Sequence, residues 1–186
     1  MGSEGMFGIA TAICIRLTPN PPDVRTMLLD FSSVRDGTDT VSAIIAAGMV
    51  PAALEMMDRL CLEAVEAYVH AGLPTDAAAA LLVELAGPSA AVAADAERVR
   101  EIGEQRGARS VRVARDEAER ALLWKGRKNA FGAIARIKPN YYLHDTVVPR
   151  RHLSEVLEHV YRIVASHRSE EHTSELQSPC NLVCRL

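Results

Sequence analysis

The sequence contains few aromatic residues and no long apolar run. Phe, Trp and Tyr make up 4% of its 186 residues. Asp, Glu or Arg interrupts each apolar run before it reaches the length of a membrane-spanning helix. Lysine and arginine are spread along the chain, and no basic block with interleaved aromatic residues indicates nucleic-acid binding. The first residues carry no basic stretch before their apolar part, which is not the pattern of a signal peptide.

Cysteine is also scarce, with four residues in the whole chain. Cys14 and Cys61 stand singly in apolar surroundings, and we expect both to be buried thiols. The net charge is −3 and 48% of the residues are hydrophobic. This composition predicts one soluble globular domain in a reducing, cytoplasmic environment.

Hydrophobic periodicity predicts alternating strands and helices. We expect strands at 9–17, 26–31, 53–57, 79–85, 110–114 and 141–148, and helices at 34–47, 59–71, 89–106, 116–131 and 152–166. Asp58 is a suitable N-cap for the second of these helices. Short connections, and polar patterning on only one face of the helices, favour an antiparallel sheet with helices on one face. The expected class is therefore a ferredoxin-like α+β fold.

The stretch 116–149 carries most of the candidate chemistry, and reads DEAERALLWKGRKNAFGAIARIKPNYYLHDTVVP. On its helix, Leu123, Arg127 and Ala130 lie on neighbouring turns, so an apolar face can carry a single guanidinium group. The planar group of Arg127 can hold a small carboxylate through two parallel hydrogen bonds. The alternative is that Arg127 and Lys128 belong to a solvated basic face of a surface helix.

The chain opens with a glycine-rich segment made of Gly2, Ser3, Glu4, Gly5, Met6, Phe7, Gly8 and Ile9. Glycines permit tight turns and a close approach of the backbone to a ligand. The alternative is an ordinary loop in front of the expected strand at 9–17.

Six motifs, taken in order, resemble the C-terminal domain of FAD-linked oxidases of the vanillyl-alcohol-oxidase type. Within that family the chain is most similar to the flavin subunit of glycolate oxidases, with D-lactate and D-2-hydroxyglutarate dehydrogenases as relatives. The resemblance covers residues 1 to about 167. The motifs are GSEG at 2–5, PAALEMMD at 51–58, DEAER at 116–120, WKGRKNAF at 124–131, PNYY at 139–142 and DTVVPRR at 145–151.

The resemblance implies a fragment of an FAD-dependent 2-hydroxy-acid dehydrogenase that transfers a hydride from the substrate α-carbon to FAD. Residues 1–18 would end the FAD-binding domain, and Gly2 to Ile9 would touch the cofactor. Met6 and Phe7 stand where the family has Thr and Leu. Residues 19–167 would form the substrate domain, in which Arg127 holds the substrate carboxylate. Phe131 and Leu143 stand where relatives that use larger acids have Thr and Lys, which disfavours a dicarboxylate substrate.

The resemblance also implies partners. They include a second flavin subunit and an iron–sulfur subunit, which would hold a cytoplasmic enzyme at the inner face of the membrane. The resemblance also allows a divalent metal ion in the complete enzyme. The family's metal and base residues lie in an H-x-G-D-G-N-x-H and an E-H-G segment, and neither segment occurs in this sequence. We therefore assign no catalytic residue and no metal ligand, and expect a chain that is inactive alone and binds FAD poorly.

Both ends depart from the family pattern. The long flavin-binding region that precedes this point in the family is absent, so we expect a truncated start. Residues 168–186 lack core-forming periodicity and resemble a sequencing-library adapter translated in one frame, and we expect a non-native or disordered tail. The alternative is a metal-binding tail with His172, Cys180 and Cys184, which is an incomplete zinc set. A second function class also remains, a non-catalytic ferredoxin-like binding or assembly domain.

Overall fold

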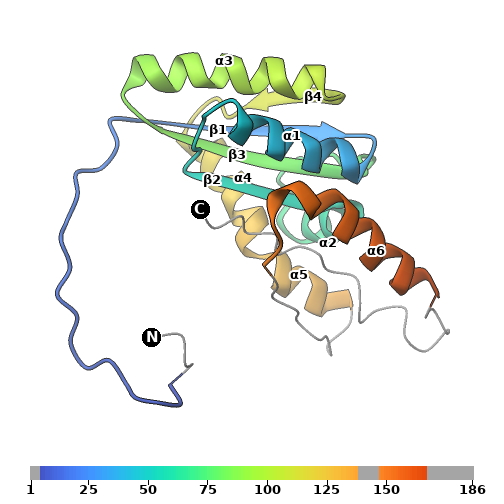
Figure 1. Ribbon diagram of the computed structural model, residues 1–186, viewed down its shortest axis with the longest axis horizontal. Coiled ribbons are helices and arrows are strands. Elements are labelled where there is room, and N and C mark those ends of the chain that lie inside the picture. The colour runs from blue at the N-terminus through green and yellow to red at the C-terminus, as the bar shows by residue number, and fades with distance from the viewer. Residues whose placement is uncertain (1–4, 138–146, 167–186) are drawn as a thin grey trace.

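The computed structural model describes residues 5–137 and 147–166, and is built on one antiparallel sheet with the strand order β2-β3-β1-β4 (Figure 1). The strands are β1 (Asp23–Phe31), β2 (Ala53–Asp58), β3 (Ala79–Gly87) and β4 (Ala108–Val113). Helices α1 (Val34–Ala46) and α3 (Ser89–Gln105) connect β1 to β2 and β3 to β4. This order and pairing are those of a ferredoxin-like fold, so the predicted antiparallel α+β class is confirmed.

The two central strands are apolar on both faces. β1 pairs with β3 so that Leu28 lies opposite Leu82 and Met27 opposite Val83. All four side chains are buried, although neighbours along a strand point to opposite faces. A strand that is buried on both faces reads as a continuous apolar run rather than an alternating one, and it requires cover on both sides of the sheet.

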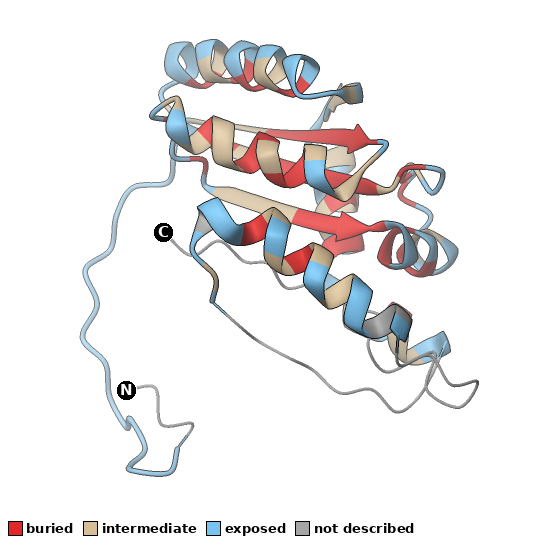
Figure 2. Cartoon of the chain, turned by 45° about the vertical axis from the view of Figure 1, so that its right-hand side comes forward, coloured by how far each residue is buried: buried red, intermediate tan, exposed pale blue. Residues whose placement is uncertain are grey.

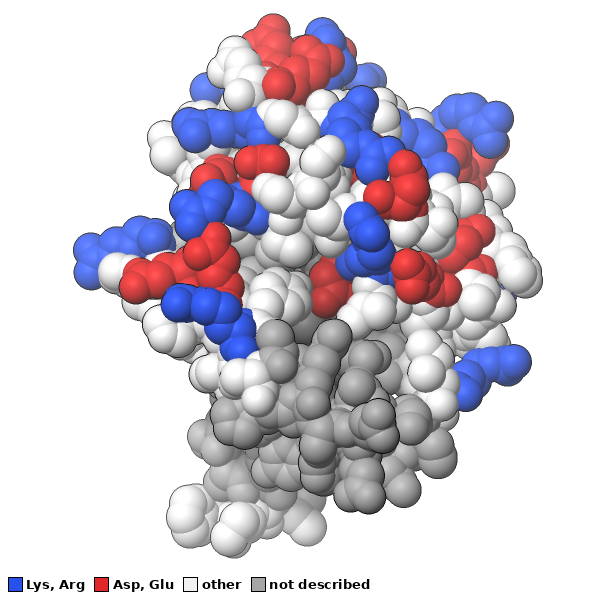
Figure 3. Space-filling view, turned by 90° about the vertical axis from the view of Figure 1, so that its right-hand side faces the viewer, with Lys and Arg blue, Asp and Glu red and all other residues white. Residues whose placement is uncertain are grey.

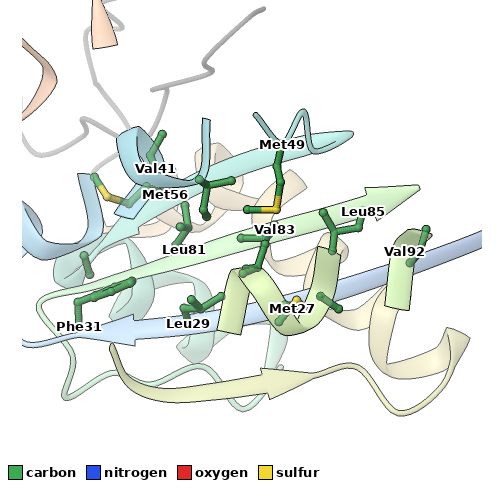
Figure 4. Close-up of a cluster of buried hydrophobic side chains, with 14 of the residues drawn as sticks. Met27, Leu29, Phe31, Val41, Met49, Met56, Leu81, Val83, Leu85 and Val92 are labelled. Carbon is green, nitrogen blue, oxygen red and sulfur yellow. The ribbon is translucent and has the colours of Figure 1, made fainter. Parts of the chain in front are cut away.

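The first face is covered by α1, α3 and α6 (Leu153–Ser166), and its core is drawn in Figure 4. Met27, Leu29 and Phe31 of β1 meet residues such as Val41 of α1 and Val99 of α3. Polar contacts fix α6 against α1, because the Arg35 Nε donates to Glu158 Oε1 at 2.8 Å. The short turn η1 (Arg150–His152) precedes α6.

The second face is covered by three further helices, which corrects the expectation of helices on one face only. They are α2 (Arg59–Val69), α4 (Glu117–Lys128) and α5 (Ala130–Ile137). Leu62 and Val65 of α2 and Leu123 of α4 pack with Leu28 and Leu82 of the sheet. The physical reason for this second layer is the continuous apolar runs of β1 and β3, which leave the second face nonpolar.

One predicted helix is broken in two. The expected helix at 116–131 ends as α4 at Lys128, and α5 begins at Ala130. The Asn129 side chain between them donates from Nδ2 to the carbonyl of Lys125 at 2.8 Å. The backbone N–H of Asn129 donates to the same carbonyl at 3.1 Å and to that of Gly126 at 3.2 Å, so the last turn of α4 is tightened and capped at this residue.

The expected strand at 9–17 is wrong, because the described part of this segment is exposed and irregular (Figures 1 and 2). Ile9, Ile13 and Leu17 are 71–87% exposed, and Cys14 is exposed rather than buried. A strand needs a partner that satisfies its backbone groups, and the segment has none within the described residues. Cys61 is buried, as predicted. The expected strand at 141–148 lies almost entirely outside the described residues.

No described helix has both the length and the apolar character to cross a membrane. The other predicted elements at 26–31, 34–47, 53–57, 59–71, 79–85, 89–106, 110–114 and 152–166 are confirmed, with shifts of a few residues at their ends.

At Gly103 helix α3 packs closely against the sheet. A Cβ atom there would lie 2.4 Å from Leu29 Cδ2, and Leu29 is fully buried. We expect Gly103→Ala to lower the free energy of unfolding by about 1–2 kcal/mol, because overpacking outweighs the gain in helix propensity. Gly132 of α5 has open space at the same atom, and Gly132→Ala should stabilise by about 0.5–1 kcal/mol. Urea unfolding measures both, and equal stabilisation by the two variants would contradict the packing.

Asp58 caps α2 from a buried position. Its Oδ1 accepts from the backbone N–H of Cys61 at 3.0 Å, and Tyr161 donates to Oδ2 at 3.3 Å. Burial raises the pKa of Asp58, and the bonds from Cys61 and Tyr161 only partly oppose this. Asp58→Ala should cost about 0.5–2 kcal/mol of stability, whereas Asp58→Asn keeps an acceptor for the cap.

The raised pKa of Asp58 also predicts a pH dependence. Asp58 binds a proton more tightly in the folded state than in the unfolded state. The stability gained from this protonation is complete below the pKa of Asp58 in the unfolded chain, and it is lost as the pH rises through the pKa of Asp58 in the folded chain. The stability of the unsubstituted chain relative to Asp58→Asn should therefore fall between acidic and neutral pH in urea unfolding. A relative stability that instead rises with pH would contradict the prediction.

Candidate functional site

Helix α4 presents two arginines to the second face of the sheet. Arg120 and Arg127 lie two turns apart, so their side chains leave the same side of the helix. The Asp116 side chain starts the helix by accepting from the backbone N–H of Glu119 at 2.8 Å. Acidic residues occupy the first turn and basic residues the last turn, an arrangement that the helix dipole favours.

Arg127 is buried and paired with Glu55 of β2. Its Nε donates to Glu55 Oε2 at 2.8 Å, and its Nη2 lies 2.8 Å from the same oxygen. The two side chains are 10% and 15% exposed. Arg127 is therefore not part of a solvated basic face, whereas Lys128 is exposed. Removing one member of such a buried pair costs several kcal/mol, about 3–5, because the other charge is left uncompensated.

Arg120 makes the corresponding contact with Glu84 of β3. Its Nε donates to Glu84 Oε2 at 3.0 Å, and the same oxygen accepts from Thr26 Oγ1 at 2.8 Å and from the indole N–H of Trp124. Burial raises the pKa of Glu84, but the hydrogen bonds from Arg120, Thr26 and Trp124 and the charge of Arg120 outweigh it, and the net pKa lies below its ordinary value. Glu84 is thus held as a carboxylate.

An open groove of about 640 Å³ runs between α4 and the start of β2. Its size suits a small organic ligand, and two lysines supply positive charge at its wall. It is lined by Ala52, Ala53, Glu84, Glu117, Arg120, Ala121, Trp124, Lys125, Lys128 and Asn129. Arg127 does not line this groove in the described part of the chain, because it points to Glu55 instead.

The predicted cofactor residues lie apart from Arg127. Gly5 to Ile9 belong to an exposed segment that runs away from the sheet and helices (Figures 1 and 2), and Met6 and Phe7 are 83% and 93% exposed. Gly5 has a φ of 82°, a backbone conformation that glycine adopts readily. Gly2, Ser3 and Glu4 lie outside the described residues.

The described residues bring no three His, Cys, Asp or Glu side chains together at metal-binding distance. Charges of both signs are mixed over the described part of the face in Figure 3, without a patch of one sign.

Glu55 and Glu84 are the residues whose roles the sequence analysis missed. The alternation of β2 did place Glu55 on the same face as the buried Met57, which was a usable signal.

Comparison with protein-family models matches residues 20–182 to the family described as FAD linked oxidases, C-terminal domain. The glycolate oxidase subunit GlcD of Escherichia coli strain K12 is 49% identical over 162 residues, which are 87% of this chain and 32% of that protein. The subunit of the same name from Bacillus subtilis is 38% identical over 167 residues, 90% of this chain and 36% of that protein.

More distant similarities agree in fold. A probable mitochondrial D-lactate dehydrogenase of Danio rerio is 29% identical over 162 residues, 84% of this chain and 32% of that protein. A solved structure of alkyldihydroxyacetonephosphate synthase superimposes with a TM-score of 0.65 at 16% identity, over 92% of this chain and 35% of that one. The chain spans about a third of the length of these curated relatives. The motifs, the fold and the family match agree: the chain belongs to the FAD-linked oxidases, and residues 20–182 match their C-terminal domain.

Proposed function

We propose that this chain is part of an FAD-dependent 2-hydroxy-acid dehydrogenase of the glycolate or D-lactate type. The observation that carries the proposal is its 49% identity, over 87% of its length, to a glycolate oxidase subunit. Similarity to D-lactate dehydrogenases supports the same class of substrate. The whole protein would oxidise a small 2-hydroxy acid.

In this proposal residues 19–167 form the substrate domain and residues 1–18 end the FAD-binding domain. FAD, when bound, accepts the hydride from the α-carbon of the acid. Gly2 to Ile9 would contribute backbone N–H groups at the edge of the cofactor. Gly5 to Ile9, the described part of this segment, are exposed and enclose no pocket. They could therefore form only one edge of a cofactor site. Most of the cofactor site would therefore lie in another domain.

Arg127 would hold the carboxylate of the acid. A guanidinium group has five N–H donors in a planar fork, which matches the two oxygens of a carboxylate. Burial strengthens such a contact, because water competes less for the donors. The substrate domain would thus orient the acid so that its α-carbon faces the flavin.

A divalent metal ion does not fit the described residues, which contain no suitable ligand cluster. Any metal ion of the complete enzyme would be held elsewhere. The relatives are named as subunits, which supports a larger assembly. By the family resemblance its other members would be a second flavin subunit and an iron–sulfur subunit. In such an assembly the chain would be cytoplasmic and held at the inner membrane face by its partners.

Exchange of domains tests the proposal. The part of this chain that aligns with the E. coli glycolate oxidase subunit, 162 residues, would replace the corresponding segment of that protein. The resulting flavoprotein should bind FAD, and anaerobic addition of glycolate or D-lactate should bleach the flavin absorbance. Retained FAD with no reduction by either acid would instead favour a non-catalytic binding or assembly domain.

The role of Arg127 predicts a specific kinetic defect in this flavoprotein. Arg127→Lys keeps the charge but loses the planar fork, so kcat/KM should fall while FAD stays bound. A charge-assisted bidentate contact contributes roughly 1.5–3 kcal/mol, or about tenfold to a hundredfold in kcat/KM.

The matched control is Lys128→Ala, which removes an exposed cation next in sequence. It should leave kcat/KM nearly unchanged. A damaging Lys128→Ala beside a silent Arg127→Lys would show that the carboxylate is bound elsewhere.

A further inference from the structure

We propose that Glu55 is a positioning residue for Arg127, which fixes the plane of the guanidinium group and makes the site selective for monocarboxylates. The inference rests on the proposed function of Arg127 and adds the residue that acts through it. It follows from the geometry of the pair, the backbone that holds each member and the charge balance of the site.

The contact geometry fixes the orientation of the fork. Nε and Nη2 form one edge of the guanidinium plane, and both lie 2.8 Å from Glu55 Oε2. Two contacts from one edge to a single atom oppose rotation of the plane about the side-chain axis. Bidentate binding of a carboxylate requires a defined plane, so this restraint bears directly on substrate orientation.

Both members are anchored to rigid backbone. Glu55 lies within β2, where it is paired in register with Leu82 of β3. Arg127 follows Gly126, at which α4 packs closely against α2. A Cβ atom at Gly126 would lie 3.3 Å from Val65 Cγ1 and 3.7 Å from Leu73 Cδ1. Neither end of the ion pair can therefore move far without disturbing the core.

The neighbouring pair is built differently. Glu84 accepts from three side chains, and Arg120 also pairs with Glu117. That network joins α4 to the sheet at several points. Among the described residues Glu55 bonds through its side chain to Arg127 alone. Glu55 thus serves Arg127 alone among the described residues, and its carboxylate restrains the orientation of the guanidinium group.

Charge balance gives Glu55 its second effect. The carboxylate offsets the charge of the buried guanidinium, so an anion is not held by net charge alone and must match the fork in shape. A second carboxylate on the substrate would lie in the field of Glu55, and in a partly buried site this repulsion is not well screened. A monocarboxylate such as glycolate or D-lactate is therefore preferred over D-2-hydroxyglutarate.

Replacement of Glu55 by Gln separates these effects. Glutamine has nearly the same shape and keeps one acceptor, but it lacks the charge. In the domain-exchanged flavoprotein, Glu55→Gln should lower kcat about tenfold, because a neutral amide oxygen binds the two N–H groups more weakly than a carboxylate and the fork is less well oriented. The KM for glycolate should stay equal or fall, because the site gains net positive charge. The kcat/KM for D-2-hydroxyglutarate relative to glycolate should rise on the order of tenfold.

Two further variants provide controls. Glu119 is 14% exposed and pairs with Arg112 and Arg115, so Glu119→Gln removes a carboxylate of similar burial away from Arg127. It should leave kcat, KM and the substrate ratio unchanged within about twofold. Glu55→Asp keeps the charge but is shorter, so it should lower kcat and retain the preference for glycolate. Thermal unfolding and FAD content of every variant separate loss of fold from loss of orientation.

The outcomes distinguish this inference from the proposed function. If Arg127→Lys lowers kcat/KM but Glu55→Gln changes neither kcat nor the substrate ratio, the role of Glu55 is wrong and that of Arg127 stands. A raised KM at unchanged kcat in Glu55→Gln, or loss of the preference for glycolate in Glu55→Asp, also overturns it. If Arg127→Lys has no effect, the proposed role of Arg127 is wrong, and the role of Glu55, which depends on it, is wrong as well.

Discussion

The second face of the sheet is the constraint on which the rest of the structure depends. β1 and β3 are apolar on both sides, so a ferredoxin-like sheet with only its two crossover helices would leave Leu28 and Leu82 in water. The chain meets this requirement with α2, placed between β2 and β3, and with α4 and α5 after β4. Burial of the second face thus brings α4 against β2 and carries Arg127 to Glu55.

A buried ion pair is a weak contributor to net stability, because desolvation offsets much of the attraction between the charges. Apolar residues at positions 55 and 127 would also pack α4 against the sheet, as Leu123 of α4 already packs there. The Glu84 network also holds α4 without Arg127. Stability alone therefore gives little physical reason for a guanidinium group beneath this helix, whereas recognition of a carboxylate gives one.

Local patterns in the sequence predicted most elements, including the cap at Asp58 and the buried Cys61. Two errors share one cause. The alternation at 9–17 has the period of a strand, but no described segment pairs with it, and pairing is a property of the whole fold. The second error is the expectation of helices on one face only. Which face a helix covers depends on tertiary packing, which local patterns do not show. The pairing of Arg127 with Glu55 joins residues far apart in sequence, and periodicity indicates the face on which each residue lies but not its partner.

The break at Asn129 connects this packing to the site. A continuous helix would carry the residues after Lys128 straight on along the axis of α4. Instead α4 ends at Lys128, where Asn129 caps the carbonyl of Lys125 with both its side chain and its backbone N–H, and α5 then packs on α2 through Ala130 and Ala133. The end of α4 is therefore clamped on both sides, by Gly126 against Val65 and by α5 against α2. Arg127 lies between these two contacts, which restrict movement of its backbone. In its proposed role Arg127 presents a fixed guanidinium plane to a small acid, and a position held in this way suits that role.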